Sequence, residues 1–529
     1  MRMSEDLVKQ TEKEIDAEIH NNPLLDLNYA QAMWTLLSVV EDHNLKIHHI
    51  DKMPHEILTV YVDVLINKLS HPLRAIHFRN KPTSTTVEKT LIDDHYGWAN
   101  DWLDRAESYD CYCSIIPLWH RGKIPLSVEG NVLITNDWKT YPLEYEVYNR
   151  LVRKDGSKLE KILDPNELMP DLMSRVKYDA TSFELNLNPR LAKLLIATYS
   201  KASVDRYTLP DSWRTSAFTF GEFKAVFNAI QAILYGRFLV RAILAGEMAE
   251  HGFAHSVWMV TPSELCARLV RYTRVKKDTV HMILEYLTFG QMNINFPDIA
   301  TQPLVDLRNG YLALSPFIWN NSNAERNLCV LLNQIEEERE IYSRLTLEKE
   351  NLLCREIEQE LSGLGYEFAR GDLGDTDLDF AIIDRQEKAC ICLELKWFIE
   401  PAEIREIIQR SEELAKGVSQ AKKILRKYLD NDKRLIEQVL NIDSSYVFAV
   451  GVGSRNWIGH FDVQDEDVPI IKVKHFLEKI KELGSLKAGL TWLNGREYLP
   501  KVGVDYEVVL AESKLGKWST TWYGIKPII

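Results

Sequence analysis

Two carboxylates and a lysine stand at a spacing that could support metal-assisted chemistry. Asp379 opens one short apolar run, and the triplet Glu394-Leu395-Lys396 ends the next one. Side chains alternate along a strand, so Glu394 and Lys396 share one face while Leu395 points into a core on the other. If the two runs pair as a hairpin, Asp379 comes beside Glu394. Two carboxylates and an ammonium group would then meet, and they could hold a hard divalent cation next to an activated water.

The elements that must position these side chains are visible in the surrounding pattern. Apolar runs of strand length and amphipathic stretches of helix length alternate from about residue 345 onward. We expect strands at 380–383, 389–395, 445–452 and 470–473, and helices at 345–364, 403–429 and 474–483. This order predicts a mixed sheet with helices on both faces.

The triplet by itself is an unspecific signal. An acidic residue two positions before a lysine also occurs at Asp137, Glu222 and Glu512. Only Glu394 also has an upstream Asp, two strands and flanking helices. A surface ladder of cross-strand ion pairs is the alternative interpretation of the hairpin.

With its flanking helices, the hairpin resembles the PD-(D/E)XK nuclease superfamily, which has the restriction endonuclease-like fold. The resemblance covers roughly residues 346–480, about a quarter of the chain. The Pro that often precedes the first Asp of the family motif is replaced here by Leu378.

The resemblance implies a Mg²⁺-dependent phosphodiesterase, with Mn²⁺ as a substitute metal. Asp379, Glu394 and the backbone carbonyl of Leu395 would hold the metal ion. Lys396 would orient or deprotonate the attacking water, and the metal would stabilise the charge that develops on the phosphate.

The resemblance also suggests a role for the first helix of the domain. In the family, a Glu on this helix commonly faces the metal, and Glu350 is the candidate because it precedes the apolar stripe on the same face. Glu356 and Glu360, on the flank of the helix, are competitors. A surface glutamate is the alternative in so acidic a helix.

The second helix carries a polar stripe that suits a phosphate backbone. Lys416, Gln420, Lys423 and Lys427 follow one another at steps of four, three and four. Because the family often has Gln or a basic residue here near the scissile phosphate, Gln420 is a candidate catalytic residue. Lys416, Lys423 and Lys427 are candidates for nucleic-acid binding, and an ordinary solvated helix face is the alternative.

The whole chain is expected to be a multidomain α/β protein. Its regions are a mainly helical N-terminal region at 1–200, a helical region at 201–345, a restriction endonuclease-like mixed sheet flanked by helices at 346–485 and a β-rich extension at 486–529. Helices at 262–272 and 277–289, then a hairpin at Asn309-Gly310, follow the order of a winged helix near 261–317, with a plain helical connector as the alternative. Five basic residues lie in this stretch without an acid between them: Arg268, Arg271, Arg274, Lys276 and Lys277.

Composition limits the function. The 529 residues are 45% hydrophobic, with no long uncharged apolar run and a polar N-terminus, so we expect a cytoplasmic protein that does not contact membranes. The seven cysteines form no Cys-x-x-Cys motif, which argues against zinc and disulfide frameworks. The net charge of −13 means that any nucleic acid must be bound by local basic patches.

The resemblance implies one function and leaves a second open. The first is a metal-dependent nuclease that hydrolyses nucleic-acid phosphodiester bonds, as a DNA endonuclease of the prokaryotic restriction or phage-defence type. The second is a catalytically silent protein of the nuclease fold that binds nucleic acid or acts as an assembly scaffold. The choice between DNA and RNA stays open, as does a homo-oligomer or a partner protein bound through the N-terminal region.

Overall fold

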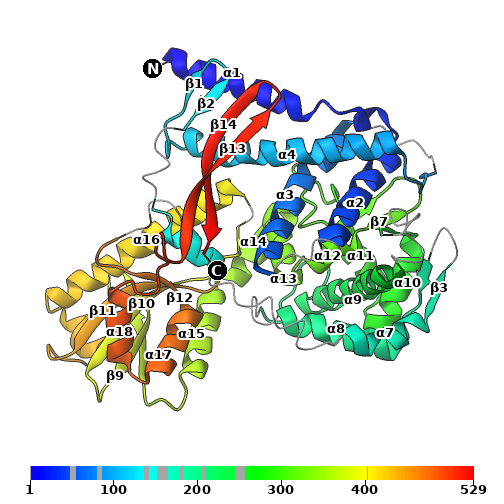
Figure 1. Ribbon diagram of the computed structural model, residues 1–529. Helices are drawn as coiled ribbons and strands as arrows, with labels where there is room; N and C mark the ends of the chain where they lie inside the picture. Colours follow the sequence, from blue (N-terminus) through cyan, green and yellow to red (C-terminus); the bar gives the residue numbers. More distant parts are fainter. Residues whose placement is uncertain are drawn as a thin grey trace.

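The computed structural model describes residues 2–47, 55–79, 86–135, 142–151, 165–178, 183–203, 209–244, 256–401, 403–460, 463 and 465–528. The fold is mixed α/β, with many helices and several small sheets (Figure 1). A mixed α/β fold with a mainly helical N-terminal region was predicted from the sequence, and this coarse architecture is confirmed.

The N-terminal part is a bundle of helices around its own apolar core. Its elements are α1 (Arg2–Ile19), η1 (Pro23–Asp26), α2 (Tyr29–Lys46), α3 (His55–Arg79) and α4 (Asp93–His120). Asn21-Asn22-Pro23 ends α1 and begins the short helix η1. The side chain of Asn22 accepts a hydrogen bond from the backbone N–H of Leu24, so it caps the short helix that Pro23 opens.

A second region is organised around the buried helix α9 (Phe220–Leu244). Its other elements are α7 (Pro165–Met173), β3 (Val176–Tyr178), β4 (Phe183–Leu185), α8 (Pro189–Ser203), β5 (Trp258–Val260), α10 (Pro262–Thr273), α11 (Lys277–Leu287), β6 (Leu304–Asp306), β7 (Leu312–Leu314), α12 (Pro316–Asn320), α13 (Ala324–Gln334) and α14 (Glu336–Thr346). Strands β5, β7 and β6 form a three-stranded antiparallel sheet in that order. Among the described helices, only α9 is long and apolar enough to cross a membrane, and most of it is buried in this core, as in a core helix of a soluble protein.

The five-stranded sheet is built around β10 (Ala389–Lys396). It pairs antiparallel with β9 (Asp377–Asp384) on one side and parallel with β11 (Val447–Ser454) on the other. The edge strands are β8 (Glu367–Asp372), next to β9, and β12 (Ile470–Lys472), next to β11. Almost every residue of β10 is buried, because helices cover both faces of the sheet, and this explains its continuous apolar run.

Helices lie on both faces of this sheet. They are α15 (Lys349–Glu360), α16 (Ile404–Leu429), α17 (Val473–Leu483) and α18 (Leu486–Asn494), with a short π-helical segment η5 (Arg434–Leu440) after α16. On one face α16 packs against β10 and β11, and its Tyr428 stacks on Phe448 with ring centroids 3.8 Å apart. On the other face α18 packs against β10 and β11, α17 against β12, and α15 contacts α17 (Figure 1).

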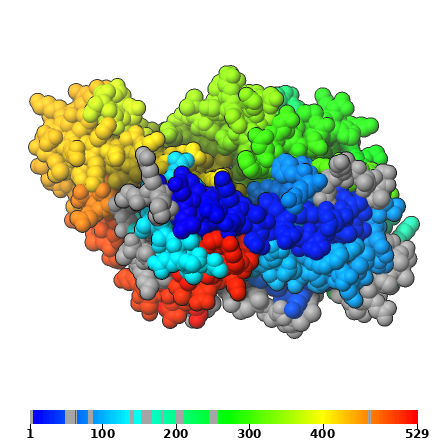
Figure 2. Space-filling view, turned by 90° about the horizontal axis from the view of Figure 1, so that it is seen from above, coloured from blue at the N-terminus to red at the C-terminus, as the bar shows by residue number. Residues whose placement is uncertain are grey.

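The C-terminal hairpin joins two short strands from the first third of the chain in a four-stranded sheet. Strands β1 (Ser127–Glu129) and β2 (Val132–Ile134) join the C-terminal hairpin of β13 (Tyr506–Leu515) and β14 (Trp518–Pro527), in the order β1-β2-β14-β13. Figure 2 shows α1, in dark blue, lying along the cyan strands and the red hairpin.

The short helix α5 (Glu144–Leu151) ties this part of the chain to the five-stranded sheet. The amide of Asn149 donates to the backbone C=O of Ile458 and accepts from its N–H at 3.0 Å. The hydroxyl of Tyr148 lies 2.8 Å from Nδ1 of His475 on α17. A segment far upstream in the sequence is therefore part of the core around the five-stranded sheet, and this sheet with its helices is called the sheet domain below.

The structure differs from the sequence-based expectations at several points. The helix expected at 345–364 is α15, which is shorter at both ends. Leu347 and Glu348 separate it from α14, and it ends at Glu360, shortly before Gly363 and Gly365, which both take positive φ. Strand β8 was not expected. The region 486–529 is not all β, since α18 buries Leu490 and Leu493 in the core of the five-stranded sheet.

Loss of the Asn149 side chain should destabilise the sheet domain. Asn149→Ala leaves two buried backbone groups of Ile458 without partners, so we expect the free energy of unfolding to fall by about 2–4 kcal/mol. Asn494→Ala, at an exposed residue, should change it by no more than about 0.5 kcal/mol. Urea unfolding followed by tryptophan fluorescence measures both, and equal midpoints for the two variants would contradict this account of α5.

Candidate functional site

The candidate carboxylates lie where β9 and β10 separate. The antiparallel ladder ends with Phe380 opposite Leu393, and the next pair would be Asp379 opposite Glu394. In place of a backbone pair at this position, Oδ2 of the Asp379 side chain accepts a hydrogen bond from the backbone N–H of Leu395 at 2.8 Å. This bond fixes the Asp379 carboxylate beside the end of β10.

Glu394 is almost completely buried, with 1% of its surface exposed. Its Oε1 accepts a hydrogen bond from Nζ of Lys396 at 2.7 Å. Its Oε2 is buried and has no hydrogen-bond partner among the described residues. The Asp379 carboxyl lies close enough for its charge to act on Glu394, so two negative charges would meet here if both groups were ionised.

The electrostatics of this cluster favour bound protons or a bound cation. Burial and then the charge of Asp379 raise the pKa of Glu394 to about 7, although Lys396 acts in the opposite direction. Burial also raises the pKa of Asp379, against the Leu395 N–H and Lys396. Burial disfavours the charge of Lys396, but Glu394, Asp379 and Glu350 outweigh it and raise the pKa of this lysine.

Helix α16 approaches the site closely at Gly417. A Cβ atom at this position would lie 3.3 Å from Cγ of Glu394 and 3.4 Å from Cε of Lys396. A larger residue would therefore press on both side chains. Gly417 allows the helix to close the site from this face and keeps water from the Glu394 carboxylate.

Helix α15 brings Glu350 to the opposite side of the cluster. Cys354, one turn later on the same face, has its Sγ 3.8 Å from the backbone C=O of Asp379. Burial and the charge of Asp379 raise the pKa of Glu350, and Lys396 lowers it. The other two candidate glutamates of this helix form ion pairs instead, Glu356 with Arg455 and Glu360 with Lys481.

Glu350 is nevertheless not in direct contact with the two strand carboxylates. No group of three His, Cys, Asp or Glu side chains ready to hold a metal ion occurs in the described part of the chain. Glu350 is exposed at the first turn of α15 and acts on Asp379 and Lys396 through its charge. The structure thus brings together Asp379, Glu394, Leu395 and Lys396, with Glu350 at the rim.

The residues next to Glu350 connect the site to the α9 region. Oε2 of Glu348 accepts a hydrogen bond from Nε1 of Trp213 at 3.1 Å. Nζ of the buried Lys349 donates to the hydroxyl of Tyr342, on α14, at 2.8 Å. The start of α15, and hence the position of Glu350, depends on contacts with residues outside the sheet domain.

The polar stripe of α16 is only partly available for a ligand. Lys416 and Lys423 are exposed, and Gln420 is half-buried, one turn after Gly417. Lys427 is different, because its Nζ lies 2.7 Å from Asp375 and 3.5 Å from Asp432. Lys427 therefore ties α16 to the loop between β8 and β9.

Gly417, Cys354 and Arg455 were not singled out from the sequence. The backbone N–H of Arg455 donates to the C=O of Lys396 at 2.9 Å, and its guanidinium lies over the ring of Trp397. A glycine inside an amphipathic helix was the one available signal for Gly417, since glycine there usually has a packing reason. The other two depend on tertiary contacts that no local pattern reports.

The donor set fits a hard divalent cation. Two neighbouring carboxylates, one with an unpartnered buried oxygen, supply the negative charge and oxygen ligands that Mg²⁺ prefers. Comparison with known proteins adds nothing to this geometry, since no family model, curated protein or solved structure matches the chain.

The raised pKa of Glu394 predicts how stability depends on pH in metal-free protein. The folded state holds the proton of Glu394 up to about pH 7 and the unfolded state only to about pH 4.5. Protonation of Glu394 therefore stabilises the folded protein at low pH, and this contribution is lost as the pH rises through 7. Glu394→Gln mimics the protonated form. We expect it to be more stable than wild type by about 1–3 kcal/mol at about pH 8 and equally stable at about pH 4.

Denaturant unfolding at the two pH values, in EDTA, measures this difference. At the higher pH, saturating Mg²⁺ should make wild type more stable than Glu394→Gln, because the cation stabilises the ionised carboxylate and binds the amide less well. Glu437→Gln, at an exposed residue, serves as the control. Equal stability of wild type and Glu394→Gln in EDTA at the higher pH would contradict the raised pKa.

Proposed function

We propose that residues 349–494 form a restriction endonuclease-like domain and that this domain hydrolyses phosphodiester bonds of DNA with Mg²⁺. The observation that carries the proposal is the buried Glu394, held between Asp379 and Lys396 with one oxygen unpartnered. A structural ion pair would leave no such oxygen, because an unsatisfied buried carboxylate is costly.

The element order supports the same proposal. Helix α15 precedes the strands β8, β9 and β10, and α16 then leads to the parallel strand β11. The carboxylates and the lysine lie at the ends of β9 and β10, between α15 and α16. This is the order of helix, acidic hairpin, helix and strand that the sequence resemblance implies.

Each residue then has a chemical role. Asp379, Glu394 and the backbone carbonyl of Leu395 would hold Mg²⁺ or Mn²⁺, with Glu350 as a further acidic group at the rim. A bound cation of this kind neutralises charge on the phosphate and lowers the pKa of its water. Lys396 keeps its charge through Glu394 and orients the attacking water. Gln420, one turn after Gly417 on α16, would contact the phosphate.

The substrate and setting follow from charge and composition. Lys416 and Lys423 offer exposed cations beside the site, as a phosphate backbone requires. We assign the protein to the cytoplasm and to a restriction or phage-defence role, as the sequence resemblance suggests. The alternative, a silent scaffold of the same fold, predicts no metal-dependent product with any nucleic acid.

Cleavage should require both the metal and the three side chains. Purified protein is incubated with plasmid, linear duplex and single-stranded DNA and with RNA, in Mg²⁺, Mn²⁺ or EDTA. We expect cleavage of DNA only with metal. Asp379→Asn, Glu394→Gln and Lys396→Ala should each reduce the rate by roughly 10²–10⁴-fold.

Metal affinity separates the roles of these variants. Lys396→Ala should bind Mn²⁺ nearly as well as wild type, whereas Asp379→Asn and Glu394→Gln should bind it more weakly. Glu360→Gln is the matched control, because Glu360 lies on the same helix as Glu350, is exposed and pairs with Lys481 and not with the site. Wild-type cleavage by Lys396→Ala, or cleavage in EDTA, would refute the proposed mechanism.

The stripe on α16 should contribute to substrate binding in proportion to its free charges. Lys423→Ala should reduce the slope of log K against log salt for duplex DNA by about 0.9, the value expected for one phosphate contact. Lys427→Ala should leave the slope nearly unchanged, because this lysine is already paired with Asp375 and Asp432. Equal slopes for wild type and Lys423→Ala would identify the stripe as an ordinary solvated face.

A further inference from the structure

Helices α10 and α11 form a helix-turn-helix unit within the α9 region. Strand β5 precedes them and the hairpin of β6 and β7 follows, and the three strands pair in the order β5-β7-β6. The helices and the hairpin occupy the residues predicted for a winged helix. In helix-turn-helix proteins the start of the second helix, here α11, is the part that reaches the nucleic acid.

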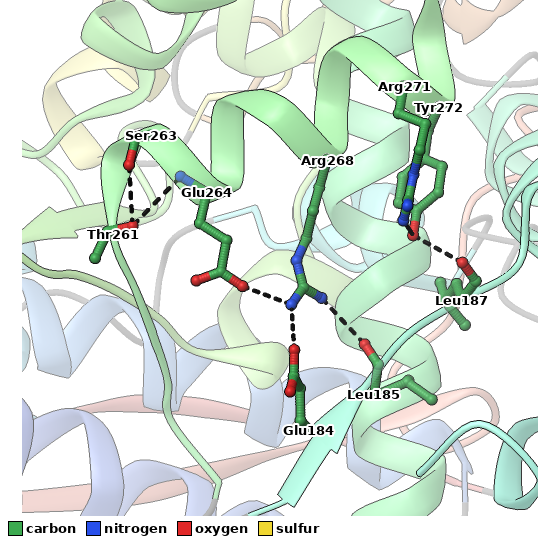
Figure 3. A network of polar contacts seen from close by, with 9 residues as sticks. All are labelled: Glu184, Leu185, Leu187, Thr261, Ser263, Glu264, Arg268, Arg271 and Tyr272. Carbon is green, nitrogen blue, oxygen red and sulfur yellow. Dashed lines mark hydrogen bonds and ion pairs between the residues drawn. The ribbon is translucent and has the colours of Figure 1, made fainter. Parts of the chain in front are cut away.

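A network of polar contacts braces α10 against the segment around β4 (Figure 3). The guanidinium of Arg268 donates to Glu264 at 2.6 Å, to Glu184 at 2.8 Å and to the backbone C=O of Leu185 at 3.1 Å. At the end of the helix, the hydroxyl of Tyr272 donates to the C=O of Leu187 at 2.9 Å. The charge of Arg268 is therefore neutralised, and the direction of α10 is fixed.

The remaining cations of this stretch gather at the turn. Arg271, Arg274, Lys276 and Lys277 are all exposed, and the structure gives none of them an acidic partner within the described residues. Arg271 contacts its neighbour Tyr272 instead, at 2.8 Å from its hydroxyl. The first backbone N–H groups of α11 lie at the same place and add to the positive potential.

The tip of the hairpin, in contrast, is held by the N-terminal helices. The guanidinium of Arg308 lies 4.0 Å from the ring centroid of Tyr29 and 3.3 Å from Nδ1 of His77. The exposed face of α11 also carries Asp278 and Glu285, which would repel phosphates if the helix entered a groove deeply. Only the turn and the first residues of α11 are suited to contact a polyanion.

We propose that the turn between α10 and α11 is a second nucleic-acid surface, which binds the phosphate backbone of duplex DNA without sequence preference. Arg271, Arg274, Lys276 and Lys277 supply the charge, and the braced α10 holds them in a fixed arrangement. This surface is separate from Glu394 and needs no metal, so it does not depend on catalysis. Its role would be to hold the duplex while another part of the chain acts on it.

Two substitutions test the surface without weakening the fold. Arg274 has a left-handed backbone with φ of 62°, which glycine adopts more easily, so Arg274→Gly removes a charge and relieves strain. Lys276 is the N-cap of α11 but makes no side-chain capping bond, so Lys276→Asp reverses a charge and supplies a better cap. The double variant should unfold at the same denaturant concentration as wild type or a higher one.

Duplex DNA binding by the full chain is measured in EDTA by fluorescence anisotropy over a series of salt concentrations. We expect the double variant to bind roughly tenfold more weakly and to lower the slope of log K against log salt by about 1.8. The control is Asn441→Gly with Lys487→Ala, which changes another left-handed residue and another exposed lysine. Unchanged affinity and slope in the double variant, or equal losses in the control, would overturn the proposal.

Two further arms separate the outcomes. Single-stranded DNA and duplex RNA are titrated in parallel, and tighter binding of either to wild type than of duplex DNA would overturn the assignment to duplex DNA. Wild type that binds duplex in EDTA but cleaves nothing with Mg²⁺ would refute the nuclease and leave this surface intact. Efficient cleavage with no contribution of the turn to binding would refute the second surface and leave the proposed nuclease intact.

Discussion

The burial of a carboxylate at the end of a central strand is the constraint on which the site depends. Glu394 has 1% of its surface exposed, and Lys396 neutralises only one of its oxygens. A buried anion without full compensation costs several kcal/mol, and here it raises the pKa of Glu394 to about 7. An ionised Glu394 is therefore incompletely compensated, and either a proton or a bound cation would remove this cost.

This constraint explains why residues far apart in sequence converge on the site. Gly417 lets α16 close one side, and Cys354 places α15 against Asp379 on the other. The first residues of α15 are held by Trp213 and Tyr342, which belong to the α9 region. A shift of that region relative to the sheet would move Glu350 first, because Glu350 follows Glu348 and Lys349 directly. The acidic rim of the site is thus mechanically connected to the region that carries the α10–α11 turn.

Local patterns in the sequence were sufficient for the centre of the sheet domain and insufficient for its surroundings. Strand β10 and helix α16 were predicted almost to the residue, since a continuous apolar run and a long amphipathic stretch depend on neighbours in sequence. The start of α15 was predicted at residue 345 and lies at Lys349, because helical periodicity continues through Leu347. The contribution of α5 could not be predicted, because Asn149 has its partner at Ile458 and no local signal reports such a distance.

Charge neutralisation within the chain determines where an acidic protein can meet a polyanion. The net charge of −13 repels DNA at long range, and this repulsion is screened beyond about 8–10 Å at ordinary salt. Several basic residues are already neutralised, as Arg268 is by Glu184 and Lys427 by Asp375. Two groups of exposed basic residues without an acidic partner among the described residues are Lys416 and Lys423 on α16, beside the carboxylates, and those at the turn before α11. If one duplex contacted both groups, two weak contacts on one chain would raise the effective concentration of DNA at the site, which neither contact could do alone. Binding through both would also compensate for a repulsion that either patch alone is too small to overcome.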